Sequence, residues 1–244
     1  MASKKTKSGQ HREINPAVTR LSAATPFQVT EAYKTVRTNL LFSLASAQSK
    51  VVLVSSALPS EGKSTTCANL AITMAQTAAR VLLIDADLRK PTQHKIFKLH
   101  NGKGLSRLLV GFDTLTDALH PDVEPGLDVI TAGPMPPNPS ELLGSENMQV
   151  LLDNLKDHYD LILIDTPPVN VVSDALVLAG DTLGVVLVAR QKQTTYDELD
   201  KALESIKFAK TNVVGVVLVD VKESVKINGY YKSYKSYDYE YGKN

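Results

Sequence analysis

The sequence predicts an α/β fold in which helices cover both faces of a parallel β-sheet. Short continuous apolar runs recur along the chain, and helical segments separate most of them. Such runs are typical of parallel strands that are buried on both faces. Strand–helix alternation further implies right-handed crossovers between neighbouring strands. The expected strands are 51–55, 80–85, 127–131, 160–165, 183–188 and 213–219.

Helix starts support the same architecture. Thr25 followed by Pro26 is a favoured N-terminus, because the hydroxyl can cap and proline fits the first helical position. Thr195 and Glu198 form a capping box before another helix. The proline-rich segment 133–144 is interpreted as a surface loop that enters a helix. The expected helices are 26–47, 63–79, 145–158, 172–180 and 195–209.

Bulk properties limit the class of protein. The 244 residues suffice for one domain with extensions, and a hydrophobic content of 43% is ample for a core. A formal net charge of +1 gives no reason to expect nucleic acid as a partner. The single Cys67 excludes an internal disulfide and fits a reducing compartment. No apolar run approaches the roughly 18 residues of a membrane span, so a cytoplasmic protein is expected.

We expect three parts along the chain: a flexible basic leader at 1–24, a folded domain at 25–220 and a disordered tail at 221–244. Six of the nine tyrosines lie in this tail, where they alternate with Lys, Ser, Gly, Asp and Glu and form no apolar face. By itself such a tail could also be a low-complexity terminus without chemistry. The tail tyrosines are Tyr230, Tyr231, Tyr234, Tyr237, Tyr239 and Tyr241.

A phosphate-binding loop follows the first expected strand. Segment 57–64 reads Ala-Leu-Pro-Ser-Glu-Gly-Lys-Ser and precedes an expected helix, which is the context that this motif requires. Its N–H groups and the helix dipole favour phosphate oxygens. Ala57 replaces the usual first glycine, which is tolerable at negative φ, and a chance Gly-Lys-Ser is the alternative. The candidate nucleotide-binding residues are Ser60, Glu61, Gly62, Lys63, Ser64 and Thr65.

Within this loop, Lys63 would reach the β- and γ-phosphates, and the Ser64 hydroxyl would hold Mg²⁺. Asp85 ends a strand and Asp87 lies two positions further on, so both carboxylates can point to the same side. Magnesium prefers oxygen ligands and keeps several waters. Alternatively, the Asp-x-Asp pair could cap the next helix. Arg89 is a candidate catalytic cation or an ordinary surface ion-pair former.

Asp165 ends another apolar strand and is followed by two prolines. This resembles a Walker B element, whose Asp holds magnesium through water, although a turn start is an equal reading in isolation. Open parallel sheets bind ligands at the carboxyl ends of their strands. The loop, the Asp-x-Asp pair and Asp165 all fall there, which favours a P-loop NTPase-like fold that binds ATP and Mg²⁺, with Ser64, Asp87 and Asp165 as metal ligands.

A nucleotide site beside a row of phenolic hydroxyls indicates a protein that phosphorylates its own tail. A tyrosine hydroxyl has a pKa near 10 and is protonated at neutral pH, so a carboxylate must accept its proton. Asp85 is the first choice and Asp87 the second, and the sequence does not separate a base from a metal ligand. Lys63 and Mg²⁺ would stabilise charge on the transferring group.

These motifs and the tyrosine-rich end together resemble the bacterial tyrosine kinases of capsule and exopolysaccharide synthesis, over roughly 28–244. The resemblance implies a protein tyrosine kinase in which positions 62–64, 85–89 and 165 bind Mg-ATP. It also implies that a neighbouring subunit phosphorylates the tail within a ring-shaped oligomer, which disassembles once phosphorylated. Protein substrates and a tyrosine phosphatase are further implied partners.

The chain looks like the split type found in Firmicutes, which is cytoplasmic and is activated by the intracellular segment of a membrane-spanning modulator. That would place it at the inner face of the membrane. The family's oligomerisation motif, Glu-x-x-Arg-x-x-Arg, matches Glu31, Lys34 and Arg37, whose spacing puts them on one helical face. Lysine at the middle position keeps the charge but loses the planar fork. An ordinary solvated face is the alternative.

The nearest rival class is a ParA/MinD-like ATPase that transfers phosphate only to water and switches partner or membrane binding. Those proteins place a lysine where this loop has Leu58, and they often end in an amphipathic membrane helix. A relative of nitrogenase iron proteins would need cluster cysteines. A non-enzymatic adaptor would be expected to have lost residues such as Lys63 and Asp165, which are intact here.

Overall fold

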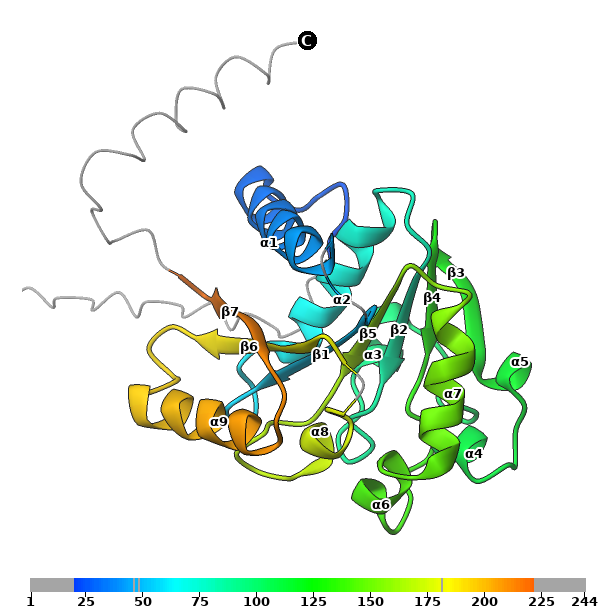
Figure 1. The fold of residues 1–244 in the computed structure, drawn as a ribbon. Coiled ribbons are helices and arrows are strands. Elements are labelled where there is room, and N and C mark those ends of the chain that lie inside the picture. The colour runs from blue at the N-terminus through cyan, green and yellow to red at the C-terminus, as the bar shows by residue number, and fades with distance from the viewer. Residues whose placement is uncertain (1–19, 46, 48, 181, 222–244) are drawn as a thin grey trace, which may run out of the picture.

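The computed structural model describes residues 20–45, 47, 49–180 and 182–221 (Figure 1). Nearly all of the expected leader and tail, including the six tail tyrosines, therefore lies outside the described residues. The described part has a central β-sheet with helices on both faces, as the sequence predicts.

The sheet has seven strands in the order β3-β4-β2-β5-β1-β6-β7. Six of them run parallel, as the sequence predicts, and the additional strand β3 pairs antiparallel with β4 at one edge. β3 was not predicted because it carries polar residues and a proline and lacks an apolar run. The strands are β1 (Val51–Ser56), β2 (Val81–Asp85), β3 (Leu119–Glu124), β4 (Leu127–Ile130), β5 (Leu161–Asp165), β6 (Gly184–Arg190) and β7 (Val213–Val219).

All expected helices are present, although 63–79 and 172–180 are shortened. Four further helices have only four or five residues, too few for a periodic pattern, and one of them lies within the expected loop 133–144. The helices are α1 (Phe27–Ala45), α2 (Lys63–Ala75), α3 (Gln93–Phe97), α4 (Leu105–Leu109), α5 (Leu115–Ala118), α6 (Pro139–Leu143), α7 (Glu146–Lys156), α8 (Asp174–Val177) and α9 (Tyr196–Phe208).

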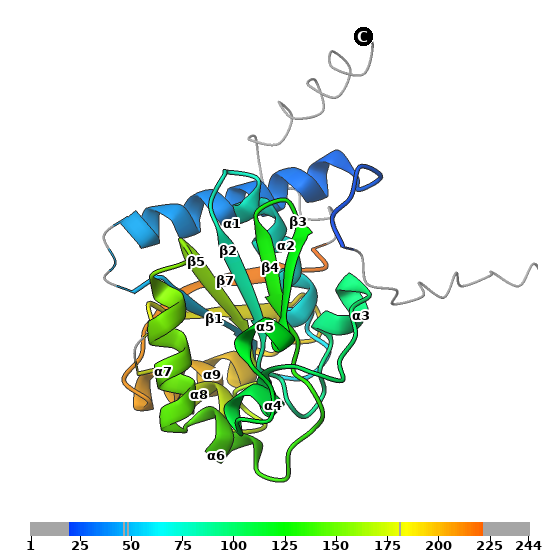
Figure 2. The same ribbon diagram turned by 90° about the vertical axis from the view of Figure 1, so that its right-hand side faces the viewer.

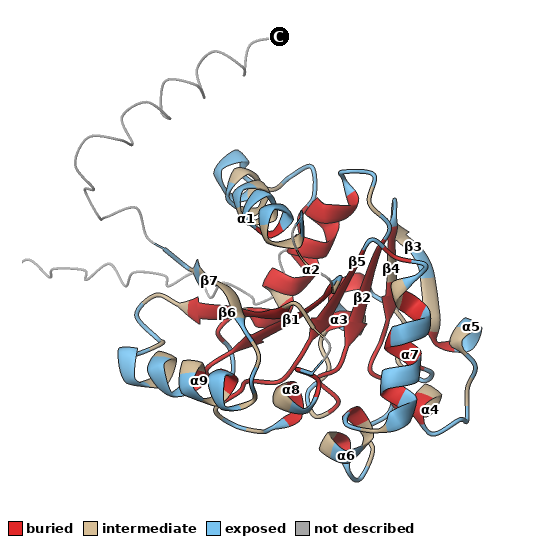
Figure 3. Cartoon of the chain, in the orientation of Figure 1, coloured by how far each residue is buried: buried red, intermediate tan, exposed pale blue. Residues whose placement is uncertain are grey.

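Alternate residues of the central strands feed two separate cores. Val52 and Val54 of β1 pack with α1, α2 and α3, whereas Val51 and Leu53 pack with α7, α8 and α9 on the opposite face. Figures 1 and 2 show these two helix layers, with α1 lying across one side of the sheet. Figure 3 shows that β1, β2, β4, β5 and β6 are almost entirely buried, whereas the edge strands β3 and β7 are partly exposed. Burial on both faces explains the apolar sequences of the inner strands.

Strand register sets the position of the candidate site. Asp165 at the end of β5 pairs in register with Asp85 of β2 and with Val54 of β1. The phosphate loop leaves β1 two residues after Val54. The three sequence motifs therefore meet at the carboxyl ends of β1, β2 and β5. Open parallel sheets commonly bind ligands at this end of their strands.

Candidate active site

The loop between β1 and α2 has the backbone that its sequence predicts. Gly62 has a φ of 92°, a conformation that favours glycine. Ala57 does not have a positive φ, so a glycine is not required there. Ser60 also has a positive φ, of 67°, which costs backbone strain in a residue with a Cβ. The first turn of α2 begins directly after Gly62, and no side chain caps it, so N–H groups of this turn remain available to a ligand.

The buried side chain of Glu61 stabilises this loop through hydrogen bonds. Its side chain is fully buried, and one carboxylate oxygen accepts a hydrogen bond from the Leu58 N–H at 2.8 Å. The other oxygen accepts a hydrogen bond from the Thr194 hydroxyl, which lies between β6 and α9. Both carboxylate oxygens of Glu61 are thus already hydrogen-bonded, so only the backbone of Glu61 is available to a phosphate. The sequence analysis did not identify Thr194, because no local sequence pattern connects this residue to the phosphate loop.

Lys63 lies at the centre of the site. Its ammonium is 2.8 Å from Asp87 Oδ2 and 3.2 Å from Asp165 Oδ1, and it donates to Ser64 Oγ at 3.1 Å. Burial alone would lower the pKa of Lys63, but the charges of Asp165 and Asp87 outweigh it and raise the pKa above its usual value. A cation thus already occupies the space between Asp87, two residues beyond β2, and Asp165 at the end of β5.

Asp85 caps a helix, which is one of the readings that the sequence leaves open. Its Oδ2 accepts hydrogen bonds from the N–H groups of Thr92 and Gln93, at 3.0 and 2.9 Å, so it caps α3. It also lies in the site beside Asp165. Burial and the charge of Asp165 raise the pKa of Asp85 to about 8, against the opposing effect of the N–H bonds. This carboxyl is therefore poised to exchange a proton near neutral pH.

The raised pKa of Asp85 makes a prediction about stability. Between about pH 4 and pH 8 the folded protein keeps a proton on Asp85 that the unfolded chain has lost, so the free energy of unfolding falls as pH rises through this window. Burial lowers the pKa values of His94 and His120, and this acts in the opposite sense below about pH 6.5. The effect of Asp85 is therefore cleanest from pH 6.5 to 8.

Urea unfolding in EDTA, without nucleotide, is expected to show a decrease in the free energy of unfolding across pH 6.5–8, with a limiting slope of about 1.4 kcal/mol per pH unit. Asp85→Asn should flatten this slope, because asparagine does not titrate. Equal slopes in the two proteins would contradict the assignment to Asp85.

Gln93 was missed by the sequence analysis and is completely buried in the site. Its side-chain Nε2 donates to Asp165 Oδ2 at 2.8 Å and to the carbonyl oxygen of Ser64 at 3.0 Å. Its position at the start of a five-residue helix carries no motif, so only the tertiary structure reveals it.

Arg89 forms a bidentate ion pair with Asp174, with Nε and Nη2 at 2.9 and 3.1 Å from the two carboxylate oxygens. Ser140 donates to Asp174 at 2.5 Å and accepts from Arg89 at 3.2 Å. Asp174 is fully buried, whereas the Arg89 side chain is about a third exposed. The ion-pair reading of Arg89 is thus correct, but the pair is a fixed one at the edge of the site.

The donor atoms around Lys63 fit a magnesium ion. Ser64, Asp87 and Asp165 offer oxygens only, which magnesium prefers. Among the described residues, no group of three or more His, Cys, Asp or Glu side chains could hold a metal ion. Magnesium at nucleotide sites needs only one or two carboxylates, since phosphates and waters complete its shell.

The residues of the expected oligomerisation motif lie on α1. Lys34 forms an ion pair with Glu31 at 2.7 Å, and both side chains are about 40% exposed. Arg37 instead donates to the carbonyl oxygen of Thr73 at 3.0 Å and so holds α1 against α2 of the same chain. No described helix has the length and apolar character of a membrane span.

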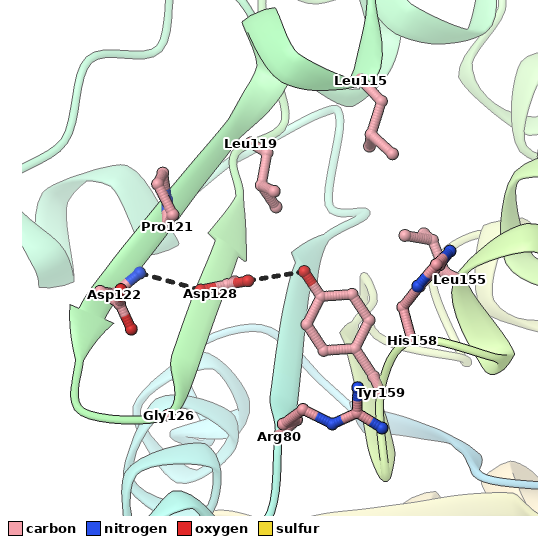
Figure 4. A pocket seen from close by; sticks show the side chains of 10 residues that line it. All are labelled: Arg80, Leu115, Leu119, Pro121, Asp122, Gly126, Asp128, Leu155, His158 and Tyr159. Atoms are coloured by element: carbon pink, nitrogen blue, oxygen red, sulfur yellow. Dashed lines mark hydrogen bonds between the residues drawn. The ribbon is translucent and has the colours of Figure 1, made fainter.

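A cavity of about 470 Å³ lies far from these motifs, near the amino ends of β2 and β5. Figure 4 shows Leu115, Leu119 and Leu155 on its walls and Tyr159 crossing it to donate to Asp128. Because it holds none of the residues that the sequence singles out, the cavity is not part of the candidate active site.

The fold and the loop define the class as a P-loop nucleotide-binding protein. In agreement, a family model described as an AAA domain matches residues 49–215. Tyrosine-protein kinase YwqD of Bacillus subtilis (strain 168) is 43% identical over 202 residues, which cover 82% of this chain and 85% of YwqD. Putative tyrosine-protein kinase CapB of Staphylococcus aureus is 42% identical, over 78% of this chain and 83% of CapB.

Solved structures agree. The kinase domain of the Escherichia coli tyrosine kinase ETK has a TM-score of 0.77 at 37% identity, covering 83% of this chain and 79% of that one. The chimerical protein CapA2B2 has a TM-score of 0.74 at 42% identity, covering 80% and 85%. The chain belongs to the bacterial tyrosine-protein kinases. A plasmid partition protein of Borrelia burgdorferi is 18% identical with a TM-score of 0.56, over 78% of this chain and 87% of that one, and shares the fold alone.

Proposed function

We propose that this chain uses Mg-ATP to phosphorylate the tyrosines of its own C-terminal tail in trans, and that it thereby regulates capsular or extracellular polysaccharide synthesis. The observation that carries the proposal is the Lys63 ammonium, which lies between Asp87 and Asp165 at the mouth of a phosphate loop. The family membership supports tyrosine as the acceptor, and six tyrosines lie within the last fifteen residues.

Each group at the site has a role in this proposal. ATP would supply the phosphoryl group, and magnesium, held by Ser64, Asp87 and Asp165, would screen its charge. Lys63 leaves its carboxylate partners to contact the γ-phosphate, where it stabilises the charge of the transferring group. Arg89, held by Asp174, adds a second fixed cation at the edge of the site.

In the transfer step, the tyrosine oxygen forms a bond to the γ-phosphorus as the bond to the β-phosphate oxygen breaks, and ADP leaves. The tyrosine proton passes to a carboxylate. Asp85 remains the first choice, because its pKa is raised to about 8 and lies close to the working pH, but it accepts the proton only in those molecules in which it is already ionised. Asp87 remains the second choice.

The partners follow from the same proposal. A ring of identical subunits would use the outer face of α1, where Glu31 and Lys34 lie among the exposed side chains of Phe27, Leu41 and Phe42. Exposed apolar groups around an ion pair are typical of protein interfaces. A membrane-spanning modulator would activate the chain at the inner face of the membrane, and a tyrosine phosphatase would reset the tail.

Complementary variants test transfer in trans. One chain carries Lys63→Met and keeps its tail tyrosines, and the other keeps Lys63 but has phenylalanine at all six tail positions. Both are incubated with Mg-ATP and the cytoplasmic segment of the modulator, alone and mixed, and are probed for phosphotyrosine. We expect phosphotyrosine only in the mixture and only on the Lys63→Met chain.

Release of ADP without phosphotyrosine in the wild-type protein would instead indicate an ATPase switch. No turnover at all would indicate an adaptor. If the wild type is labelled but the mixture is not, transfer occurs within one chain, and the trans mechanism is wrong.

A further inference from the structure

Gln93 connects three elements of the site through one side chain and one N–H group. Its Nε2 joins the carbonyl oxygen of Ser64, at the start of α2, to Asp165 at the end of β5. Its backbone N–H donates to Asp85 at the end of β2. The helix that follows the phosphate loop and two strand-end carboxylates are thus tied to a single, fully buried residue.

The hydrogen bond to Asp165 decides how that carboxylate is turned. Gln93 holds Oδ2 at 2.8 Å, so Oδ1 is the oxygen that faces the Lys63 ammonium at 3.2 Å. Lys63 Nζ also contacts Asp87 and Ser64, the other two proposed metal ligands. The amide of Gln93 therefore selects the oxygen of Asp165 that is presented to the proposed metal position.

The oxygen of the Gln93 amide, unlike its nitrogen, has no hydrogen-bond partner among the described residues. Gln93 Oε1 is buried and accepts no hydrogen bond from any described residue. Leaving such an acceptor unpaired is destabilising, and a ligand or a water that donates to it would account for it. Both hydrogens of Nε2 are already used, so any partner of this side chain must donate to Oε1.

We propose that Gln93 is a positioning residue for magnesium: it orients Asp165 through Nε2 and accepts a hydrogen bond through Oε1 from a water in the shell of the ion. The inference rests on the proposed function, since it concerns the metal of the same site. Magnesium keeps several of its waters in proteins. Replacing a group that orients a metal ligand in this way commonly lowers metal affinity by about 10- to 100-fold.

Mn²⁺ is a suitable probe, because its binding can be followed by electron paramagnetic resonance. Mn²⁺ affinity is measured in the presence of saturating ADP, and ADP affinity is measured separately in EDTA. Gln93→Met keeps the length of the side chain but has no amide. Gln93→Ala removes the amide without placing an apolar end beside the carboxylates, and it serves also if the methionine variant does not fold. Gln149→Met, at an exposed position of α7, is the matched control.

We expect both Gln93 variants to bind Mn²⁺ about tenfold more weakly than the wild type, with ADP affinity in EDTA within about twofold and no change in the control. Wild-type affinity in both variants would overturn the inference. A loss of Mn²⁺ affinity in Gln93→Ala alone would also overturn it, because the effect would then come from side-chain volume. A loss of ADP affinity in EDTA as large as the loss of Mn²⁺ affinity would overturn it as well. If the wild type itself does not bind Mn²⁺ with ADP, the proposed function is wrong and this inference falls with it.

Discussion

Lys63→Met is expected to abolish phosphorylation of the tail, with a rate at least about a hundredfold below that of the wild type. Lys63 is the cation that faces both Asp87 and Asp165 at the phosphate loop. Methionine has a similar length but no charge, so the γ-phosphate would lose its fixed positive partner during transfer. The measurement is the initial rate of phosphotyrosine formation with Mg-ATP and the modulator's cytoplasmic segment.

This substitution also leaves buried carboxylates without their cation, which is destabilising, so folding has to be checked by circular dichroism under the assay conditions. Lys201→Met, the same change at an exposed position of α9, is the matched control and should keep the wild-type rate. Undiminished labelling of a folded Lys63→Met protein would remove the loop from the mechanism.

Replacing all six tail tyrosines by phenylalanine is expected to abolish self-labelling while nucleotide binding stays unchanged. The substitutions remove the acceptor hydroxyls but keep the rings, and they leave Lys63, Asp85 and Asp165 intact. Phosphotyrosine formation and ADP affinity are measured on the same preparation. Loss of both together would contradict the separation of site and acceptor.

Any residual label on the variant without tail tyrosines should lie on Tyr196 rather than on Tyr159. Tyr196, at the start of α9, is 87% exposed. Tyr159 is buried and donates its hydroxyl to Asp128 at 2.6 Å. Burial and this bond raise the pKa of Tyr159, so its hydroxyl is a poorer nucleophile at neutral pH. Phosphosite mapping by mass spectrometry distinguishes the two, and label on Tyr159 would contradict this reasoning.

Much of the fold could be predicted because its signals are local. An unbroken apolar run such as that of β5 and a capping box such as that before α9 specify their elements within a few residues. Prediction failed where no such signal exists. β3 is a polar edge strand, and it forms because β4 lies beside it. The helices α3 to α6 are too short for a period to be read.

The candidate site divides in the same way. Asp85 and Asp165 end apolar strands, and Lys63 follows another apolar strand after the phosphate loop. Topology therefore places all three at the carboxyl ends of parallel strands. Gln93, Asp174 and Thr194 come from unrelated parts of the chain and meet these residues only after folding. The structure also gave Asp85 a second task, as the cap of α3, and turned Arg37 inward against α2.

The sequence by itself determined the six parallel strands, the longer helices, the phosphate loop and the acidic strand ends, since each depends on neighbours along the chain. Only the tertiary structure decided which oxygen of Asp165 faces Lys63, which acid holds Arg89 and how far burial shifts the pKa of Asp85. Those properties depend on distances between segments distant in sequence and on the exclusion of water from the space between them, and neither is encoded in any local pattern.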